Sequence, residues 1–441
     1  MSMKKFMTAL ILLAACASGA FAQDDAPLAA LLLRAASDNP QIAASKQRTA
    51  AAEAQIIEAN AKMLPKVNVG TGALWQRDGL SQKLPDEMSF LGVFNLPVGY
   101  RNTYAAAVAL TQVIYSGGTL PAQKEAAKLS RDSLTAQEIR TQESVSNAVR
   151  RAYYGLRRAQ AKELVARDAV TLAKRHLAQA EKLFKAGVVA KSDVLRSKVA
   201  VSSAELDLIR MQNASAVALV ALRRAVGSEI SSPLDELRGL DAILADDAGF
   251  DVKTAGADVE TAFERRQELR VYALLAKQAE KLARAAKGQT LPQVIGSIGY
   301  VAADDKFFPT EQSEPIAALG AYWNLYDGGE MRAKTAEAKA KAQEMLFLLE
   351  DMKNGIRMEV TQAELNIRSA QSRLETARRQ LASSREDYRI AVRRYDEKVG
   401  TNLDTLDARL ALTDSMSEVI NAVYDIKTAE ADLIYAVGER R

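Results

Sequence analysis

Two long stretches of the chain repeat apolar and small side chains at spacings that alternate between three and four residues. In the second stretch, larger side chains alternate with alanine or serine along this seam: Val360, Ala363, Ile367, Ala370, Leu374, Ala377, Leu381, Ser384, Tyr388, Ala391 and Tyr395. The first stretch repeats the seam from Val149 to Phe184. Such a heptad seam is typical of coiled coils. The pattern predicts helices over about residues 121–185 and 330–396, each about 100 Å long if continuous.

The two stretches belong to a duplication with a constant offset of 211 residues, which pairs residues 117–227 with residues 328–438. Upstream the offset changes to 227, because Leu64-Pro65 corresponds to Leu291-Pro292. The first copy therefore holds 16 extra residues between its Leu-Pro pair and its double glycine. The chain is built from two copies of one unit.

A second pattern follows the Leu-Pro pair in each copy: successive residues alternate between an apolar face and a small or polar face. In the first copy one face carries Val67, Val69, Thr71, Ala73 and Trp75, and the other largely Asn68, Gly70, Gly72 and Gln76. Alternation of this kind predicts a β-strand. Three further strands are predicted at about residues 103–115, 294–301 and 316–326, so that both tryptophans, Trp75 and Trp323, lie in strands.

Strands with one apolar face, one small or polar face and aromatic residues near their ends are typical of transmembrane β-barrels. Four strands cannot close such a barrel, because the smallest ones have about eight. Closure would require several chains, and three chains would supply twelve strands. From the alternation alone, the alternative is a pair of water-soluble hairpins.

Turn and capping residues separate the predicted elements. Asn39-Pro40 is typical of a helix N-terminus, and the helix that it opens is predicted to run to Met63. The double glycines Gly117-Gly118 and Gly328-Gly329 are expected to form turns from strand to helix rather than phosphate-binding loops. Each long helix then ends in a short break, at residues 185–190 and 397–402, before another helix returns.

The repeat also defines the expected domains. Between the two copies the chain is richer in Gly, Asp and Ser, which is typical of a connector. The predicted division is a signal peptide at 1–22, a first repeat at 23–227, a connector or equatorial segment at 228–258, a second repeat at 259–438 and a tail at 439–441.

The composition favours long helices over compact mixed domains. Only 6% of the 441 residues are aromatic, and Ala, Leu, Lys, Arg and Glu are abundant. The formal net charge is +4, and no strongly basic face indicates a nucleic-acid partner. No His-x-x-x-His, cysteine pair, Gly-x-Ser-x-Gly or Gly-Lys-Ser/Thr motif occurs, so neither an enzyme nor a metal or cofactor site is predicted. His176, the only histidine, lies off the seam and is expected at the surface.

The N-terminus is typical of an export signal. Lys4-Lys5 precede an apolar run from Phe6 to Ala15, and Ala20-Phe21-Ala22 forms a small-x-small cleavage pattern. Beyond it no stretch approaches the roughly 20 apolar residues of a membrane-spanning helix. A membrane-spanning part would therefore have to be a β-barrel.

The only cysteine, Cys16, raises a second possibility, because Leu13-Ala14-Ala15-Cys16 is similar to a lipobox whose cysteine becomes lipidated. If the first strand lies in the membrane, the helix that begins at Pro40 starts about 36 Å below it. The stretched chain from Cys16 to Pro27 reaches about 36 to 40 Å. Because this tether would be at its limit, cleavage by signal peptidase is favoured over lipidation.

The order of these features, given twice, resembles the TolC family of outer-membrane efflux and secretion channels. The order is a helix with an Asn-Pro start, a Leu-Pro stop, two strands, a turn of the form Tyr115-Ser116-Gly117-Gly118 or Tyr326-Asp327-Gly328-Gly329, a long heptad helix, a tip and a return helix. The resemblance covers essentially the whole mature chain.

The resemblance implies a mainly α-helical homotrimer with a membrane β part. Its twelve strands would form a barrel through the outer membrane of a Gram-negative bacterium, continued by an α-helical barrel across the periplasm. Such a channel is a passive export duct of a tripartite efflux pump or type I secretion system. Its partners would be a periplasmic adaptor (membrane fusion) protein, an inner-membrane pump of the RND, ABC or MFS type, and outer-membrane lipid.

The resemblance also implies a gate near the periplasmic helix tips. Tyr395 matches the gate tyrosine, and Asp404 and Asp407 match the aspartate pair of the constriction. Ser192 and Asp193 match the partner site on the first copy. Because the two aspartates are three residues apart, they share one helix face. Three chains would place six carboxylates around one opening, which gives the hypothesis that the ring favours cations.

The sequence departs from the family pattern at the latch and at one tip. Gly400 stands where the family's gate arginine would fall, and Lys398 stands where the tip glycine would fall. Lys398 or Arg394 could supply a cation nearby. Adaptor docking is implied at both tips, Ala186-Gly187-Val188 and Lys398-Val399-Gly400, and the first keeps the pattern better.

Two alternatives remain at this point. The longer segment from Arg77 to Arg101 is either a functional external loop, which narrows the mouth or serves phage attachment, or a tolerated surface insertion. The function could also be that of a periplasmic coiled-coil structural or adaptor protein. Such a protein would share the heptads but would not need four amphipathic strands.

Overall fold

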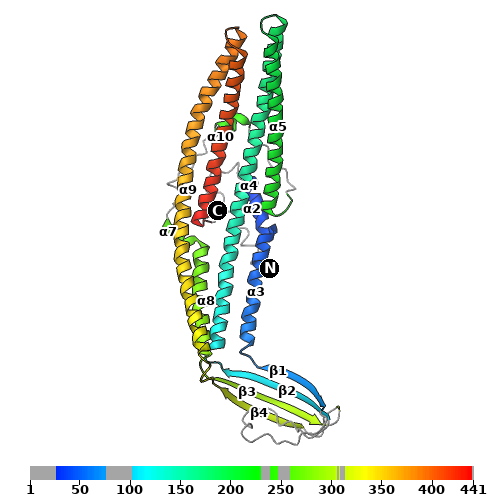
Figure 1. The fold of residues 1–441 in the computed structure, drawn as a ribbon, viewed down its shortest axis with the longest axis vertical. Helices are drawn as coiled ribbons and strands as arrows, with labels where there is room; N and C mark the ends of the chain where they lie inside the picture. The colour runs from blue at the N-terminus through cyan, green and yellow to red at the C-terminus, as the bar shows by residue number, and fades with distance from the viewer. Residues whose placement is uncertain are drawn as a thin grey trace, which may run out of the picture. The chain divides into compact units, whose positions relative to one another are not determined.

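The computed structural model describes residues 26–75, 102–229, 239–246, 259–304, 307 and 313–439 (Figure 1). The predicted signal peptide with Cys16, the segment from Arg77 to Arg101, and much of the connector lie outside the described residues. The elements are α2 (Ala26–Asp38), α3 (Pro40–Ala61), β1 (Lys66–Trp75), β2 (Asn102–Tyr115), α4 (Thr119–Lys185), α5 (Lys191–Val226), α6 (Leu240–Leu244), α7 (Val259–Arg265), α8 (Gln267–Gly288), β3 (Gln293–Asp304), β4 (Ser313–Tyr322), α9 (Glu330–Asp396) and α10 (Asn402–Val437).

The chain divides into two compact units. Unit 1 comprises Met1–Lys46, Glu138–Gln267 and Lys353–Arg441, and unit 2 comprises Gln47–Gln137 and Glu268–Met352. Each unit therefore contains parts of both sequence copies. In the described part of the chain, no helix is both long enough and apolar enough to cross a membrane.

Unit 1 is a layer of helices held together by the predicted seams. Along α9 every seam position from Val360 to Tyr395 is buried or half-buried. Along α4 the same holds from Val149 to Ala180, whereas Phe184 is exposed because it lies in the last turn before the tip. The helices α9, α10 and α4 share one apolar core, to which α6 contributes Ile243 and Leu244. The seam prediction is confirmed except at its last residue in the first copy.

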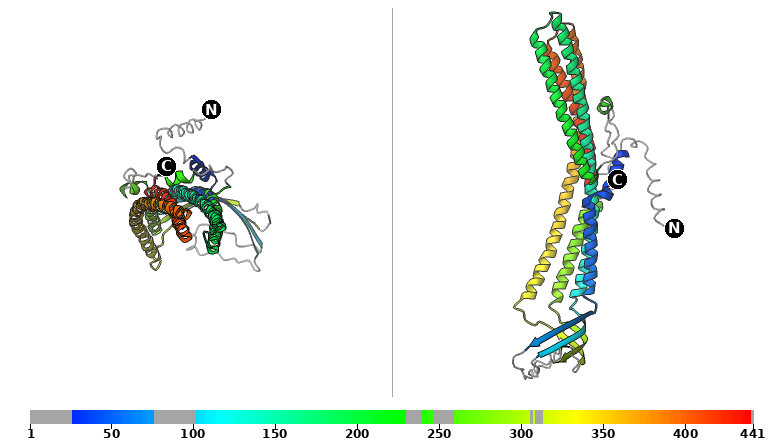
Figure 2. Two further views of the ribbon diagram at one scale, coloured as in Figure 1. Left: turned by 90° about the horizontal axis from the view of Figure 1, so that it is seen from above. Right: turned by 90° about the vertical axis from the view of Figure 1, so that its right-hand side faces the viewer.

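The helix α4 is buried on two faces rather than one. Val170 and Ala173 pack against Val201 and Ala204 of α5, and the two helices lie side by side in Figure 1 and in the right-hand view of Figure 2. A different row of α4, which includes Ala161 and Val165, packs against α9 and α10. Side chains of α4 that lie off the first seam, such as His176, are therefore buried as well.

The helix α2 was not predicted. Leu28, Leu31 and Ala35 form its buried stripe, at spacings of three and four, and they pack with Val149 of α4 and Leu222 of α5. The stripe spans only three positions, which is too short to stand out in the sequence.

The predicted start of α3 at Pro40 is confirmed. The Asn39 Oδ1 accepts a hydrogen bond from the Gln41 N–H at 2.8 Å, as an N-cap does. The Asn39 Nδ2 donates to the Ala225 carbonyl at 2.8 Å, which joins this turn to the end of α5. The helix ends at Ala61, two residues before the predicted end.

The β part of unit 2 is a four-stranded antiparallel sheet in the order β1-β2-β3-β4 (Figure 1). Its register aligns apolar residues on one face: Val67, Val69, Val108, Leu110, Ile298, Tyr300 and Leu319. The other face carries small and polar residues: Asn68, Gly70, Gly72, Ala105, Ala107, Ala109 and Gly299. The predicted alternation thus holds through β1 and most of β2, whereas β3 and β4 also place Ile295, Val301 and Ile316 on this second face. The apolar face is largely exposed.

The fourth strand ends earlier than predicted. Tyr322 pairs with Gln293, the first residue of β3, so residues beyond Tyr322 have no strand to pair with. Trp323 therefore lies outside the sheet, where its indole Nε1 donates to the Thr290 carbonyl at 3.1 Å. The placement of Trp323 in a strand was wrong.

Both double glycines stand between a strand and a long helix. Gly117, Gly118, Gly328 and Gly329 all have positive φ, between 62° and 96°. In the second copy, both oxygens of the Asp327 carboxylate accept backbone N–H bonds, from Gly329 and from Met331. The left-handed backbone is the physical reason for glycine at these positions.

Candidate gate at the helix tips

The first tip, between α4 and α5, closes with a left-handed residue. Gly187 has φ of 73°. Its N–H donates to the Phe184 carbonyl at 2.9 Å, and the Val188 N–H donates to the Leu183 carbonyl at 2.9 Å. These bonds satisfy carbonyls at the end of α4 that have no partner within the helix, as in a Schellman-type cap.

The second tip repeats this backbone with a different residue. Lys398 has φ of 65° and is the one non-glycine residue with positive φ among those described. Its N–H donates to the Tyr395 carbonyl at 3.1 Å, and the Val399 N–H donates to the Arg394 carbonyl at 2.8 Å. Lysine in this conformation costs about 1 to 2 kcal/mol relative to an unstrained backbone. The duplication thus continues through the tip, and Lys398 carries a cost that Gly187 avoids.

Close packing at the second tip requires glycine at position 400. A Cβ at this position would lie 2.9 Å from the Cβ of Arg394 and 3.1 Å from the Arg394 carbonyl carbon. The Gly400 N–H donates to the Arg394 carbonyl at 2.9 Å. The backbone therefore leaves no room for the arginine that the family resemblance would put here.

The start of α10 is held by a capping box. The Thr401 Oγ1 accepts from the Asp404 N–H at 3.1 Å, and the Asp404 Oδ2 accepts from the Thr401 N–H at 3.1 Å. The corresponding residue at the start of α5, Ala190, has the same extended backbone but no side-chain cap. Only the second hairpin has this reinforcement.

We expect Thr401→Ala to lower the free energy of unfolding by about 1 kcal/mol, the usual cost of losing a cap. The reciprocal change, Ala190→Thr, should raise it by a similar amount, because the extended Ala190 backbone already suits a cap. Urea unfolding followed by circular dichroism measures both changes. Equal stability of the two variants would contradict this account of the tips.

The predicted constriction aspartates are both exposed. Asp404 and Asp407 lie in the first two turns of α10. Hydrogen bonds from the Thr401 backbone and side chain hold the pKa of Asp404 below its usual value. Asp404 is therefore ionised at neutral pH while it also caps the helix.

The predicted gate tyrosine is buried. Tyr395 is 3% exposed, and its hydroxyl has no hydrogen-bond partner among the described residues. Burial, followed by the charges of Asp193 and Asp396, raises the pKa of Tyr395. The tyrosine and Asp193 are thus close enough to interact electrostatically, but no hydrogen bond links the Tyr395 hydroxyl to Asp193.

The ring of Tyr395 instead lies against His176, with ring centroids 5.0 Å apart. His176 was predicted at the surface, and that prediction was wrong, because it is only 8% exposed. The row of α4 side chains that includes Val165 and His176 faces the second hairpin, formed by α9 and α10. A search for a second seam along α4 would have revealed this.

Asn402, the first residue of α10, was not predicted as a site residue. It is 3% exposed and its Oδ1 lies 2.6 Å from the His176 Nε2. Its Nδ2 donates to the backbone carbonyl of Asp193 at 3.1 Å. The structure therefore brings Tyr395 and Asp193 into one cluster with His176 and Asn402, whereas Asp404, Asp407 and Ser192 stay exposed.

The predicted docking residues differ in exposure. Ala186, Gly187, Val188, Lys398 and Val399 are exposed, and Gly400 is half-buried. Val188 and Val399 present apolar side chains at equivalent places on the two tips.

Comparisons with known proteins agree with this architecture. The family described as outer membrane efflux protein matches residues 31–228 and 259–439. The outer membrane protein TolC of Vibrio cholerae serotype O1 is 23% identical over 422 residues, which are 93% of this chain and 90% of that protein.

Solved structures share the fold. The structure of CusC has a TM-score of 0.80 at 17% identity and covers 94% of this chain and 92% of its own. The outer membrane protein VceC of Vibrio cholerae has a TM-score of 0.75 at 17% identity and covers 93% of this chain and 96% of its own. Because the family match spans most of the sequence and includes both copies, the chain belongs to the outer membrane efflux protein family and is an outer-membrane efflux channel with a periplasmic extension.

Proposed function

We propose that three copies of this chain assemble into one passive export duct, with a twelve-stranded barrel in the outer membrane and a helical barrel in the periplasm. In this proposal the signal peptide is 1–22, the repeats are 23–227 and 259–438, and the connector is 228–258. The observation that carries the proposal is that the sheet and the helical layer each end in an edge that the described part of the chain leaves uncovered.

The sheet has two open edges. The strands β1 and β4 each pair on one side only. An open edge offers unpaired backbone donors and acceptors, which native proteins cover or pair. Pairing of β4 with β1 of another copy would extend the sheet, and three copies would close it with twelve strands.

The helix α5 has a second heptad seam that faces away from its own core. The seam runs at spacings of four and three, and every residue on it is exposed: Leu195, Val199, Ser202, Leu206, Ile209, Asn213, Ala216 and Val220. An exposed apolar seam of this length is a surface for another helix. The equivalent helix of the second copy, α10, is covered by α4 and α9 of the same chain. The uncovered seam therefore fits a second copy of this chain.

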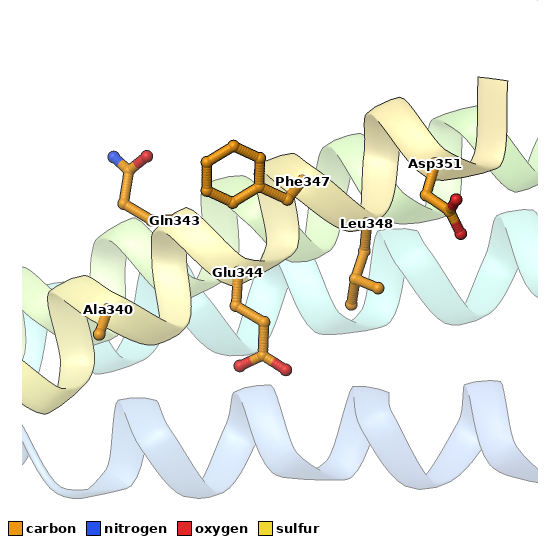
Figure 3. A pocket seen from close by; sticks show the side chains of 6 residues that line it. All are labelled: Ala340, Gln343, Glu344, Phe347, Leu348 and Asp351. Carbon is orange, nitrogen blue, oxygen red and sulfur yellow. The ribbon is translucent and has the colours of Figure 1, made fainter. Parts of the chain in front are cut away.

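In unit 2, α9 has an exposed apolar groove lined by Ala340, Gln343, Glu344, Phe347, Leu348 and Asp351. Figure 3 shows Phe347 and Gln343 pointing to one side of the helix and Glu344 and Leu348 to the other. Phe347 is 73% exposed. Such a patch is suited to burial against a neighbouring chain.

The two kinds of edge differ from each other, so one copy would contact the next head to tail. Contacts of this heterologous kind close into a ring when the rotation between copies divides a full turn. Two copies of the repeat in each of three chains would give a tube with approximate sixfold symmetry. The exposed apolar face of the sheet would then contact outer-membrane lipid.

The gate of this duct would lie at the tips. Tyr395 and Asp193 belong to the buried cluster between the hairpins, and Ser192, Asp404 and Asp407 are exposed beside it. The two tips, Ala186 to Val188 and Lys398 to Gly400, would receive a periplasmic adaptor protein. That adaptor would connect the duct to an inner-membrane pump, which selects the cargo, in a tripartite efflux or type I secretion system. The duct itself needs no catalytic group or cofactor.

A bilayer recording of the purified protein tests the duct and its carboxylate ring together. The variant should be Asp404→Asn with Asp407→Asn rather than alanine, because Asp404 accepts a bond from the Thr401 N–H that asparagine can keep. We expect stepwise conductance with cation preference in the wild type, and a cation-to-anion permeability ratio nearer to unity in the variant.

Asp414→Asn is the matched control, since Asp414 is exposed on the same helix two turns further on. It should leave the permeability ratio unchanged. Unaltered selectivity of the double variant would overturn the carboxylate ring, and a complete lack of conductance by the wild type would contradict the duct.

A further inference from the structure

The tips of the two hairpins are joined by a buried polar cluster around the only histidine of the chain. The His176 Nε2 lies 2.6 Å from the Asn402 Oδ1, and the Asn402 Nδ2 lies 3.1 Å from the Asp193 carbonyl oxygen. The Ser197 hydroxyl lies 2.9 Å from the same carbonyl and 3.3 Å from the Asn402 Oδ1. His176, Asn402 and Ser197 are 8%, 3% and 1% exposed.

The direction of each hydrogen bond follows from the backbone carbonyl. The Asp193 carbonyl oxygen can only accept, so the Asn402 amide nitrogen must face it. The Asn402 Oδ1 then faces His176 and can only accept, so the histidine must donate through Nε2. The neutral imidazole protonated at Nε2 satisfies this arrangement fully.

The cluster connects the copies rather than stabilising each one. His176 lies on α4, Asp193 and Ser197 lie on α5, and Asn402 begins α10. At the offset of 211, the counterpart of Asn402 is Lys191, which is exposed. The counterpart of His176 is Asp387, which is also exposed. The cluster therefore has no second copy at the equivalent positions, and it joins two different hairpins.

We propose that His176 and Asn402 form a latch that holds the two hairpin tips of one chain together, and that acid releases it. The latch itself is a contact within one chain. Its consequence, an acid-dependent opening of the periplasmic end, rests on the proposed duct function.

The surroundings of His176 favour its neutral form while the latch is closed. Burial is the main cause that lowers the pKa of His176, and the nearby Arg409 of α10 lowers it further. The hydrogen bond to Asn402 and the charge of Asp396 oppose this shift without cancelling it. The other titratable groups of the cluster are Tyr395 of α9, whose ring packs on the imidazole, and Asp193 of α5.

The sign of the pH effect follows from this lowered pKa. When the tips separate, His176 enters water, where an imidazole has a pKa of about 6.5. The separated state then binds a proton more readily than the latched state. The latch has its full strength above about pH 6.5 and loses strength as the pH falls from there through the lowered pKa of His176.

Spin labels on the two tips measure the separation directly. Ala186 and Glu397 are equivalent exposed positions on the first and second tip, and cysteines can be placed there in the full chain with Cys16→Ser. Co-expression with an excess of unlabelled chain leaves one labelled chain in each assembly. Pulsed electron paramagnetic resonance then gives the distribution of distances between the tips at about pH 7.5 and about pH 5.5.

We expect the ratio of separated to latched tips in the wild type to rise on acidification, by about tenfold at most. His176→Gln keeps an N–H donor for Asn402 but has no proton to gain, so its tips should stay latched at both pH values. Asn402→Ala removes the acceptor, so its tips should be separated at both. Lys191→Ala, at the position equivalent to Asn402, should behave as the wild type does.

Short distances in Asn402→Ala at about pH 7.5 would overturn the latch. A wild-type distribution that does not change with pH, or a His176→Gln distribution that changes as the wild type does, would overturn the release by acid. Circular dichroism of each variant verifies that the helices are intact. The distances do not depend on conductance, so a protein that shows pH-dependent tips but no conductance would overturn the duct and leave the latch standing.

Discussion

Gly117→Ala should destabilise the protein by about 2 to 5 kcal/mol, the sum of a left-handed backbone strain and an overpacking term. Gly117 has φ of 62°, and a Cβ there would lie 2.1 Å from the Gly288 carbonyl oxygen and 2.9 Å from the Leu291 Cβ. Two backbone segments meet at this place, the turn into α4 and the end of α8. Neither backbone segment can move away from the added Cβ as the end of a flexible side chain could.

Gly328 provides the matched control for this prediction. It occupies the equivalent position of the second copy and has φ of 67°, but nothing lies within 4 Å of an added Cβ. Gly328→Ala should therefore show only the backbone strain of about 1 to 2 kcal/mol. Urea unfolding monitored by circular dichroism compares the two variants. Equal losses would contradict the close contact between Gly117 and Gly288.

Arg266→Met should lower the free energy of unfolding by about 1 to 3 kcal/mol, the usual cost of leaving a buried hydrogen-bonding group without its partner, because Arg266 is buried although the side chain of its ion-pair partner Glu359 is 50% exposed. The Arg266 side chain is 2% exposed, and its Nη2 lies 2.5 Å from the Glu359 Oε2. Its Nη1 donates to the Ala436 carbonyl at 3.0 Å, at the end of α10. The substitution would remove donors from both the carboxylate and the last turn of the helix.

The neighbouring Arg265 is the control for charge. Its Nη1 is 3.7 Å from the Glu439 Oε1, and its side chain is half exposed. Arg265→Met removes the same charge from an exposed pair and should cost less than about 1 kcal/mol. The same unfolding measurement applies. A loss of similar size for both arginines would refute the role given to burial.

Repetition made much of the fold predictable. The seam from Val360 to Tyr395 and the strand alternation from Val67 to Trp75 each extend over many positions, so the pattern outweighs single exceptions. The offset between the copies also places Lys398 opposite Gly187. Short elements such as α2 were missed because a stripe of Leu28, Leu31 and Ala35 is too brief to identify a helix.

The buried cluster at the tips could not be predicted from either copy alone. His176 and Asn402 come together only because α4 packs against the second hairpin, and a single seam gives no information about that packing. The family resemblance directed attention to Tyr395 and Asp193, which do lie in the cluster. It did not indicate that an amide and an imidazole would make the hydrogen bonds there.

The central claim is that each chain presents uncovered sheet and helix edges because three chains complete one duct. Native mass spectrometry of the detergent-extracted mature protein, with gentle removal of the detergent, tests this claim most directly. The account predicts a dominant particle with the mass of three chains. A dominant particle of one, two or four chains, obtained from protein with intact helical content, would contradict it.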